Sequence, residues 1–97
     1  MTMRFQLGQI VMTPAALDAL RKSGEEPSVF VGRHQACDWG AVCSGDARAN
    51  DDAVAHEGDL DRQQRVLSSY TTKLGETIWI ITEADRSSSC LLLPSDY

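Results

Sequence analysis

The last third of the chain carries the apolar patterns of β-strands. Residues 66–73 form a run of mixed polarity, and Leu74-Gly75 follows as a hairpin turn in which glycine can take the positive φ that the turn needs. Residues 77–82 are apolar at both parities, which is typical of a central strand covered on both faces. A second turn leads into residues 89–93, and Pro94 ends that run because proline cannot donate to a β-ladder. This order predicts a three-stranded antiparallel meander.

The start of the chain predicts a helix with clear ends. Residues 5–12 are partly apolar and fit either a short strand or an extended lead-in. Thr13 is a candidate N-cap, Pro14 suits the first helical position, and Gly24 suits the position just after a helix. The sequence therefore predicts a helix over residues 14–23.

Two further helices are expected before the meander. Pro27 follows two glutamates and marks the start of a second helix, which should end near residues 35–38. Phe30 and His34 lie at i and i+4, so they share one face of this helix. The alanine-rich residues 46–56 predict a third helix.

Together these elements predict an α+β fold in which two to three N-terminal helices pack on a three-stranded antiparallel meander. A chain of 97 residues is expected to form a single domain over residues 1–97. Trp39, in a turn after the second helix, and Trp79, in the central strand, are expected to be core residues on opposite sides. If the helices cover one face of the sheet only, the other face needs a cover, and a second copy of the chain, giving a homodimer, is the simplest candidate.

Cysteine usage and hydropathy indicate the compartment. Cys37, Cys43 and Cys90 follow an N-terminus without the apolar region of a secretory signal, and no apolar run reaches the length of a membrane span. Reduced thiols in a cytoplasm are the economical interpretation, with a disulfide between Cys37 and Cys43 as the alternative. We therefore expect a cytoplasmic protein without a membrane partner.

The net charge of −5 is unevenly distributed. Seven acidic residues lie between Asp38 and Asp61, where Arg48 is the one lysine or arginine. A negative field of this kind repels phosphate backbones and attracts a basic protein groove or a metal ion, so direct nucleic-acid binding is not expected. The alternative interpretation is a solvated helix face. The candidate binding residues are Asp46, Asp51, Asp52, Glu57, Asp59 and Asp61.

Metal and nucleophile chemistry is weakly represented. His34, Cys37, Cys43 and His56 supply the two nitrogen and two sulfur ligands that a zinc site can use, but their spacing matches no common zinc motif. We predict no metal and no cofactor, and keep these four residues as weak candidates. A cysteine–histidine nucleophilic pair oriented by Asp38 is conceivable, although acidic surroundings raise the pKa of a thiol. His34 and Asp38, at i and i+4, are interpreted as a capping or orienting hydrogen bond.

Several segments resemble a known family over nearly the whole chain. They are Leu7-Gly-Gln-Ile-Val-Met-Thr-Pro-Ala-Ala-Leu17, Arg33-His34, Asp38-Trp39-Gly40, Thr77-Ile-Trp-Ile-Ile-Thr-Glu-Ala-Asp-Arg86 and Leu92-Leu-Pro-Ser-Asp-Tyr97. The chain resembles small bacterial proteins that are encoded on plasmids, phages and integrated elements. Members are called plasmid-related proteins, and some carry the label of a type I restriction-modification subunit M.

That label names a methyltransferase, and this sequence lacks the motifs that a methyltransferase needs. Such an enzyme needs a glycine-rich cofactor loop after a strand and an Asn/Asp-Pro-Pro-Tyr/Phe motif that holds the flipped base. Leu93-Pro-Ser-Asp-Tyr97 lacks the second proline, and 97 residues cannot build a doubly wound sheet. The resemblance implies an accessory protein of a mobile element and gives no activity.

The sequence favours a non-enzymatic function in which this small acidic protein binds another protein. The expected partner is a nucleic-acid-binding host factor, such as a component of a defence system against foreign DNA, whose basic groove the acidic segment would occupy. Two alternatives remain open: a small metal- or thiol-dependent hydrolase, and a dimeric regulatory module that senses a ligand.

Overall fold

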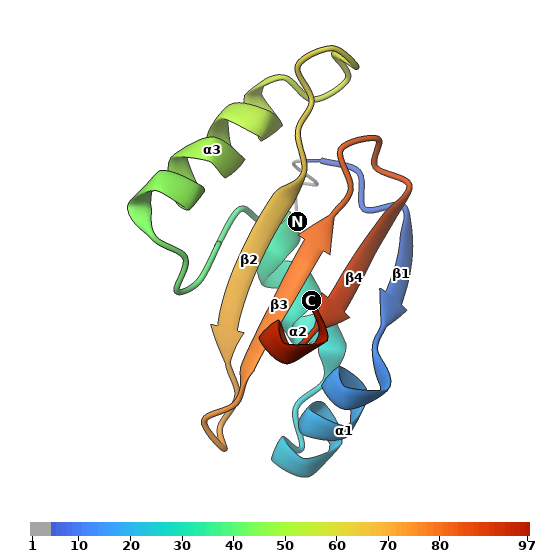
Figure 1. Ribbon diagram of the computed structural model, residues 1–97, viewed down its shortest axis with the longest axis vertical. Coiled ribbons are helices and arrows are strands. Elements are labelled where there is room, and N and C mark those ends of the chain that lie inside the picture. The colour runs from blue at the N-terminus through green and yellow to red at the C-terminus, as the bar shows by residue number, and fades with distance from the viewer. Residues whose placement is uncertain (1–4) are drawn as a thin grey trace.

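The computed structural model describes residues 5–97 and has the α+β architecture that the sequence predicts (Figure 1). Along the chain the elements are β1 (Gln9–Met12), α1 (Pro14–Ser23), α2 (Pro27–Gln35), α3 (Ser44–Ala55), β2 (Val66–Thr71), β3 (Thr77–Thr82), β4 (Ser88–Leu92) and a short 3₁₀ helix, η1 (Pro94–Asp96).

The sheet contains four strands in the order β1-β4-β3-β2. The last three strands of the chain form the predicted antiparallel meander, in which Thr82 of β3 lies between Val66 of β2 and Ser89 of β4. β1 is a fourth strand that the predicted meander did not include, and it runs parallel to β4 with Val11 beside Cys90. The sequence allowed a strand at this position but not its partner, which lies at the other end of the chain.

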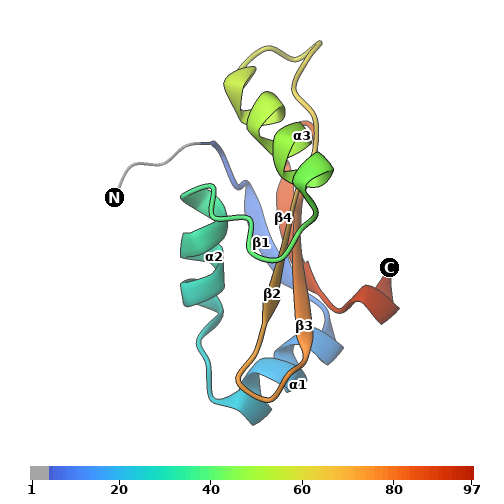
Figure 2. The same ribbon diagram turned by 90° about the vertical axis from the view of Figure 1, so that its left-hand side faces the viewer.

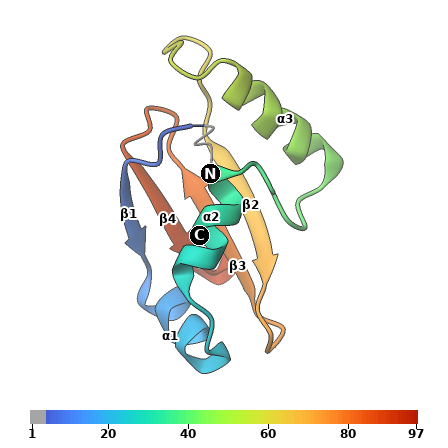
Figure 3. The same cartoon turned by 180° about the vertical axis from the view of Figure 1, so that it is seen from behind.

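α1 and α2 cover one face of the sheet (Figure 2), and α2 runs along that face when the molecule is seen from behind (Figure 3). Because side chains alternate across a strand, one parity of each strand points toward these helices. We call this the inner face. Its apolar core consists of Ala16, Ala19, Leu20, Phe30, Tyr70, Ile78, Ile80 and Leu91.

The helix ends explain the bounds of α1 and α3. Thr13 Oγ1 accepts a hydrogen bond at 3.2 Å from the backbone N–H three residues further on, and Gly24 ends α1 in the left-handed region with φ 72°. α3 begins at Ser44, two residues before its predicted start. Cys43 provides the cap there, since its Sγ accepts from the Asp46 N–H at 3.4 Å.

The two tryptophans lie in different surroundings. Trp39 is buried, and its ring packs 6.0 Å from the ring of Phe5. Trp79 is only half-buried, on the outer face of the sheet, where its ring meets the Tyr97 ring edge-on at 6.0 Å. Of the described helices, only η1 lies on this outer side (Figure 2). The expectation that Trp79 is a core residue was therefore wrong for a single chain.

The inner face should dominate the stability of the fold. Replacing the fully buried Ile80 by alanine removes packing between the sheet and the helices, and we expect it to lower the free energy of unfolding by about 2–5 kcal/mol. The matched change Ile10→Ala affects a side chain that is 46% exposed and should cost less than about 1 kcal/mol. Urea unfolding of both variants measures the difference, and equal losses would show that the core is misplaced.

Candidate functional site: an acidic surface on a fixed helix

α3 lies beside the edge of β2 (Figure 1), and Asn50 fastens it there. The Asn50 Nδ2 donates to the Leu67 carbonyl at 2.6 Å, and the Leu67 N–H donates to Asn50 Oδ1 at 3.1 Å. One side-chain amide thus satisfies both outward-pointing backbone groups of a strand residue, as a neighbouring strand would. Because Asn50 is buried, these two bonds fix the position of α3 relative to the sheet.

The loop that precedes α3 supplies a second attachment. The Ala41 N–H donates to the Ser69 carbonyl at 2.7 Å, and the Ser69 N–H donates to the Trp39 carbonyl at 3.1 Å. Gly40 permits this approach, because its φ is 72° and a Cβ atom would lie 2.0 Å from the Ser69 carbonyl oxygen. The Trp39 indole then reaches α3 itself, where its Nε1–H donates to Asp51 Oδ1 at 2.9 Å.

The outer side of α3 and the turn after it carry five exposed carboxylates. We call them the acidic surface, which consists of Asp46, Asp51, Asp52, Asp59 and Asp61. Arg48 and Arg62 are exposed in the same part of the chain, and Arg62 Nε lies 4.0 Å from Asp59 Oδ2. The exposed acids therefore outnumber the exposed bases here, and the surface has a net negative charge.

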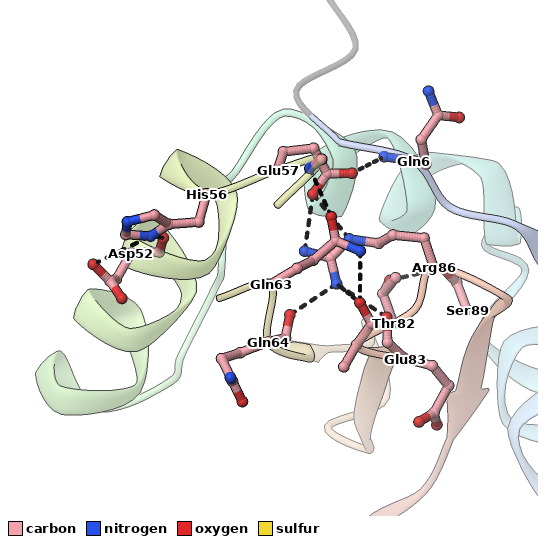
Figure 4. A network of polar contacts seen from close by, with 12 residues as sticks. Gln6, Asp52, His56, Glu57, Gln63, Gln64, Thr82, Glu83, Arg86 and Ser89 are labelled. Carbon is pink, nitrogen blue, oxygen red and sulfur yellow. Dashed lines mark hydrogen bonds and ion pairs between the residues drawn. The ribbon is translucent and has the colours of Figure 1, made fainter. Parts of the chain in front are cut away.

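Glu57, the sixth predicted surface acid, has a different position. It accepts from the buried Arg86, with 2.9 Å between Glu57 Oε1 and Arg86 Nη2 and 3.0 Å to Arg86 Nε (Figure 4). Its other oxygen accepts from the Gln6 N–H at 2.9 Å. Glu57 is thus a structural residue, and we remove it from the candidate binding surface.

Arg86 connects the turn after α3 to the β3–β4 turn. It lies in the left-handed region with φ 59°, and its Nη1 donates to the carbonyls of Gln64 at 2.8 Å and Glu83 at 3.0 Å. Gln63 strengthens the same junction, since its amide donates to the Ala84 carbonyl at 2.7 Å and accepts from the Gly58 N–H at 2.8 Å. These bonds hold the turn that carries two of the surface acids.

His34 is buried beneath the sheet and belongs to a chain of hydroxyl groups. Its Nε2 lies 2.9 Å from Thr82 Oγ1, Thr82 Oγ1 lies 2.7 Å from Ser89 Oγ, and Ser89 donates to the Leu7 carbonyl at 2.8 Å. Its Nδ1 contacts Ser68 Oγ on β2. His34 therefore joins α2 to all three strands of the meander and, through Ser89, to the segment before β1.

The direction of these hydrogen bonds assigns the tautomer of His34. A carbonyl oxygen can only accept, so the Ser89 hydroxyl donates its proton to the Leu7 carbonyl and must accept a hydrogen bond from Thr82. Thr82 in turn accepts from His34, which places a proton on Nε2. Burial, with the nearby positive charge of Arg86, lowers the pKa of His34 to about 3, so the ring is neutral and Nδ1 accepts from Ser68.

The remaining metal candidates do not meet. His34 lies in the core, Cys43 is exposed at the start of α3, and His56 lies at the far end of that helix, where its Nδ1 is 2.9 Å from the Asp52 carbonyl. Cys37 packs beside the cluster around Phe5 and Trp39. Within residues 5–97, no group of three or more histidine, cysteine or acidic side chains is arranged to hold a metal ion, and no disulfide forms.

Asp38 pairs with a different residue from the one expected. The Arg33 Nε donates to Asp38 Oδ2 at 2.7 Å, and this bond holds the pKa of the Asp38 carboxyl below its usual range. The expected hydrogen bond between His34 and Asp38 does not form, because His34 points into the core. Arg33 and Tyr70 line a shallow depression of about 370 Å³. The Arg33 guanidinium in it already forms an ion pair with Asp38. This depression therefore gives the ligand-sensing alternative no support from an arginine that is free to bind a ligand.

The comparisons with other proteins add no relative. The chain matches no protein-family model, and no curated protein and no solved structure shows significant similarity to it. Among the described helices, none is long and apolar enough to cross a membrane.

Sequence reasoning missed the residues that position the acidic surface. Asn50 stands one turn before Ala53 on the inward stripe of α3, and a polar residue on such a stripe is a signal that could have been used. Ser68, Thr82 and Ser89 each occupy an inward position of a strand, where three hydroxyls signal a shared polar partner. Arg86 gave no comparable signal, since it stands in a turn directly after two acids, Glu83 and Asp85, where a local ion pair is the default expectation.

Asn50→Ala should detach α3 from β2. The variant leaves the Leu67 N–H and carbonyl without partners, and we expect a loss of about 2–4 kcal/mol in the free energy of unfolding. Arg48→Ala, an exposed change on the same helix, should stay within about 0.5 kcal/mol of the parent protein. Urea titration measures both, and amide exchange at Leu67 should rise in the Asn50 variant only.

His34 should make stability depend on pH. Its pKa lies well below the ordinary 6.5, so the unfolded chain takes up a proton that the folded protein refuses. The stabilisation is complete above pH 6.5 and is lost as the pH falls toward 3, by about 1.4 kcal/mol per pH unit. Unfolding of the parent and of a His34 variant between pH 6.5 and 5 measures this effect.

His34→Gln should be less stable than the parent at pH 7 and should lose the slope over that interval. In the parent, His34 Nδ1 should still lack a proton at pH 5, which the nitrogen chemical shifts of the ring report. A flat stability profile, or a protonated His34 ring at that pH, would contradict the assignment.

Proposed function

We propose that this protein is a non-enzymatic accessory protein of a mobile element that binds a basic surface of another protein through its acidic surface. The observation that carries the proposal is the combination of five exposed carboxylates with a support that holds them still. The mobile-element assignment rests on the resemblance of the sequence segments described above.

The rigid support favours binding over mere solubility. Side chains on a mobile tail lose conformational freedom when they bind, whereas α3 is already fixed to β2 by Asn50 and to the preceding loop by Trp39. The turn after α3 is held by Arg86 and Gln63. A preorganised negative surface also raises the rate at which a positively charged partner associates.

The partner that this chemistry fits is a protein with a basic groove for nucleic acid. Such a groove uses lysine and arginine to neutralise phosphates, and a row of carboxylates presents the same sign of charge. The protein itself should not bind nucleic acid through this surface, because the field repels phosphate groups. If the groove belongs to a host system that acts on foreign DNA, occupying it would protect the mobile element from that system.

The test is capture of partners from a nuclease-treated bacterial lysate, followed by quantitative mass spectrometry and rate measurements on the purified partner. The variant replaces Asp46, Asp52, Asp59 and Asp61 by asparagine and spares Asp51, which accepts from Trp39. We expect association with a basic partner to slow by about tenfold or more, and the parent rate to fall with added salt.

A matched variant keeps the total charge equal. Asp18→Asn, Glu26→Gln, Glu76→Gln and Glu83→Gln remove the same number of acids elsewhere on the chain and should leave the rate within about twofold of the parent. Melting temperatures check that both variants fold. Equal loss in the two variants, or none in the first, would show that the acidic surface is only solvated.

A further inference from the structure

The two edges of the sheet differ in how their backbone groups are satisfied. On β2, the outward-pointing groups of Leu67 pair with Asn50, and those of Ser69 pair with the loop around Gly40. This edge is therefore covered at Leu67 and Ser69. β1 forms the opposite edge, and within the described chain no element lies against it (Figure 1).

The hydrogen bonds of β1 show which of its groups point away from the sheet. The Gln9 N–H donates to the Ser87 carbonyl at 3.0 Å, and the Thr13 N–H donates to the Leu91 carbonyl at 3.0 Å. Because backbone direction alternates along a strand, the intervening Ile10 and Met12 direct their N–H and carbonyl groups outward.

Apart from the shortness of the strand, which has four residues, this edge lacks the usual protection against pairing. Natural edge strands carry lysine, proline or a bulge, whereas Gln9-Ile-Val-Met12 contains none of these. The Ile10 and Val11 side chains are 46% and 38% exposed. No ionisable side chain occurs between residues 5 and 17, although the chain carries a net charge of −5.

We propose that two copies of this chain form a homodimer by antiparallel pairing of β1 with β1. A two-fold axis beside Val11 sets Ile10 of each copy opposite Met12 of the other. In that register all outward N–H and carbonyl groups of both residues form hydrogen bonds, and the two Val11 residues form a close, non-hydrogen-bonded pair on the outer face.

The outer face supports this register. Val11 stands beside Cys90, Cys90 beside Ile81, and Ile81 beside Leu67, so one apolar row crosses all four strands. Pairing at Val11 continues the row without a break into the second copy. The sheet then runs through both copies, and its outermost strands are the two β2 strands, whose outward groups at Leu67 and Ser69 already have partners.

The distribution of charge is compatible with a second copy at this edge. The acidic surface lies beside β2, at the opposite edge of the sheet from β1. In the dimer seven inter-strand spacings separate the two β2 strands, roughly 34 Å at about 4.8 Å per spacing, which is several Debye lengths at physiological salt. β1 itself carries no ionisable side chain, and the carboxylate beside its end is Asp96, which accepts from Thr13 Oγ1 at 2.7 Å. Two acidic chains therefore meet less repulsion at this edge than at the acidic surface.

The test measures mass against concentration and protection of single amides. By sedimentation, the parent should shift from the 10.6 kDa chain to twice that mass as the concentration rises from low micromolar to near-millimolar. Over the same range, hydrogen exchange should slow at the amides of Ile10 and Met12. The Val11 amide, which points toward β4, should be protected throughout.

Two variants separate this interface from others. Val11→Lys places like charges opposite each other at the axis, and Ile10→Pro removes an outward N–H that the monomer does not use. Each should raise the dissociation constant at least about tenfold. Leu74→Lys, the matched change at a side chain that is 62% exposed elsewhere, should leave it unchanged.

A monomer at every concentration would overturn the proposal. So would a dimer that both β1 variants leave intact, because the outer face around Trp79 would then be the contact. Dimer weakening by Leu74→Lys as strong as that by Val11→Lys would also count against it.

Discussion

The packing of α2 on the sheet depends on an imidazole that must stay uncharged. His34 is fully buried, and each of its nitrogens has one hydroxyl partner from a different strand. The neutral ring fits these partners as one donor and one acceptor, whereas a protonated ring would be a charged double donor in a site without a carboxylate among its contacts. The same ring is the only polar side chain of α2 that enters the described core. The position of α2 on the sheet therefore depends on the His34 ring staying neutral.

Arg86 further disfavours protonation of His34, and it forms an ion pair with Glu57. Its positive charge lowers the pKa of His34 further, and its own burial demands a partner. Glu57 provides that partner and also binds the Gln6 N–H, so one carboxylate connects three segments that are far apart in the sequence. The acidic segment is therefore divided: Glu57 faces inward and stabilises the fold, while its neighbours Asp52 and Asp59 face solvent.

The parts of the fold that local signals specify were predictable. Thr13, Pro14 and Gly24 gave α1 its bounds, and the apolar run of residues 77–82 gave β3, the centre of the meander. The pairing of β1 with β4 was not predictable, because four residues carry too little pattern to select a partner at the other end of the chain.

The candidate site followed the same division. Acidic residues can be read from a sequence and are usually exposed, and five of the six predicted surface residues are exposed in the structure. Glu57 could not be separated from them, since its role depends on Arg86, which lies 29 residues away. Trp79 looked like a core residue because apolar content alone does not say whether a second layer covers a strand. Only the placement of all three main helices on or beside one face of the sheet shows that this strand has an open side.

The two proposed binding surfaces, the acidic surface and the β1 edge, are compatible because they lie at opposite edges of the sheet. Asn50 covers the β2 edge at Leu67 and in doing so places the acidic surface there, which leaves the β1 edge for the proposed self-association. A homodimer built at β1 carries one acidic surface at each end and can engage two basic sites at once. Since the second contact is then intramolecular, weak individual contacts add to a much stronger one, provided that the sites on the partner match this separation. The edge that brings two copies together would thus set the spacing at which the acidic surfaces act.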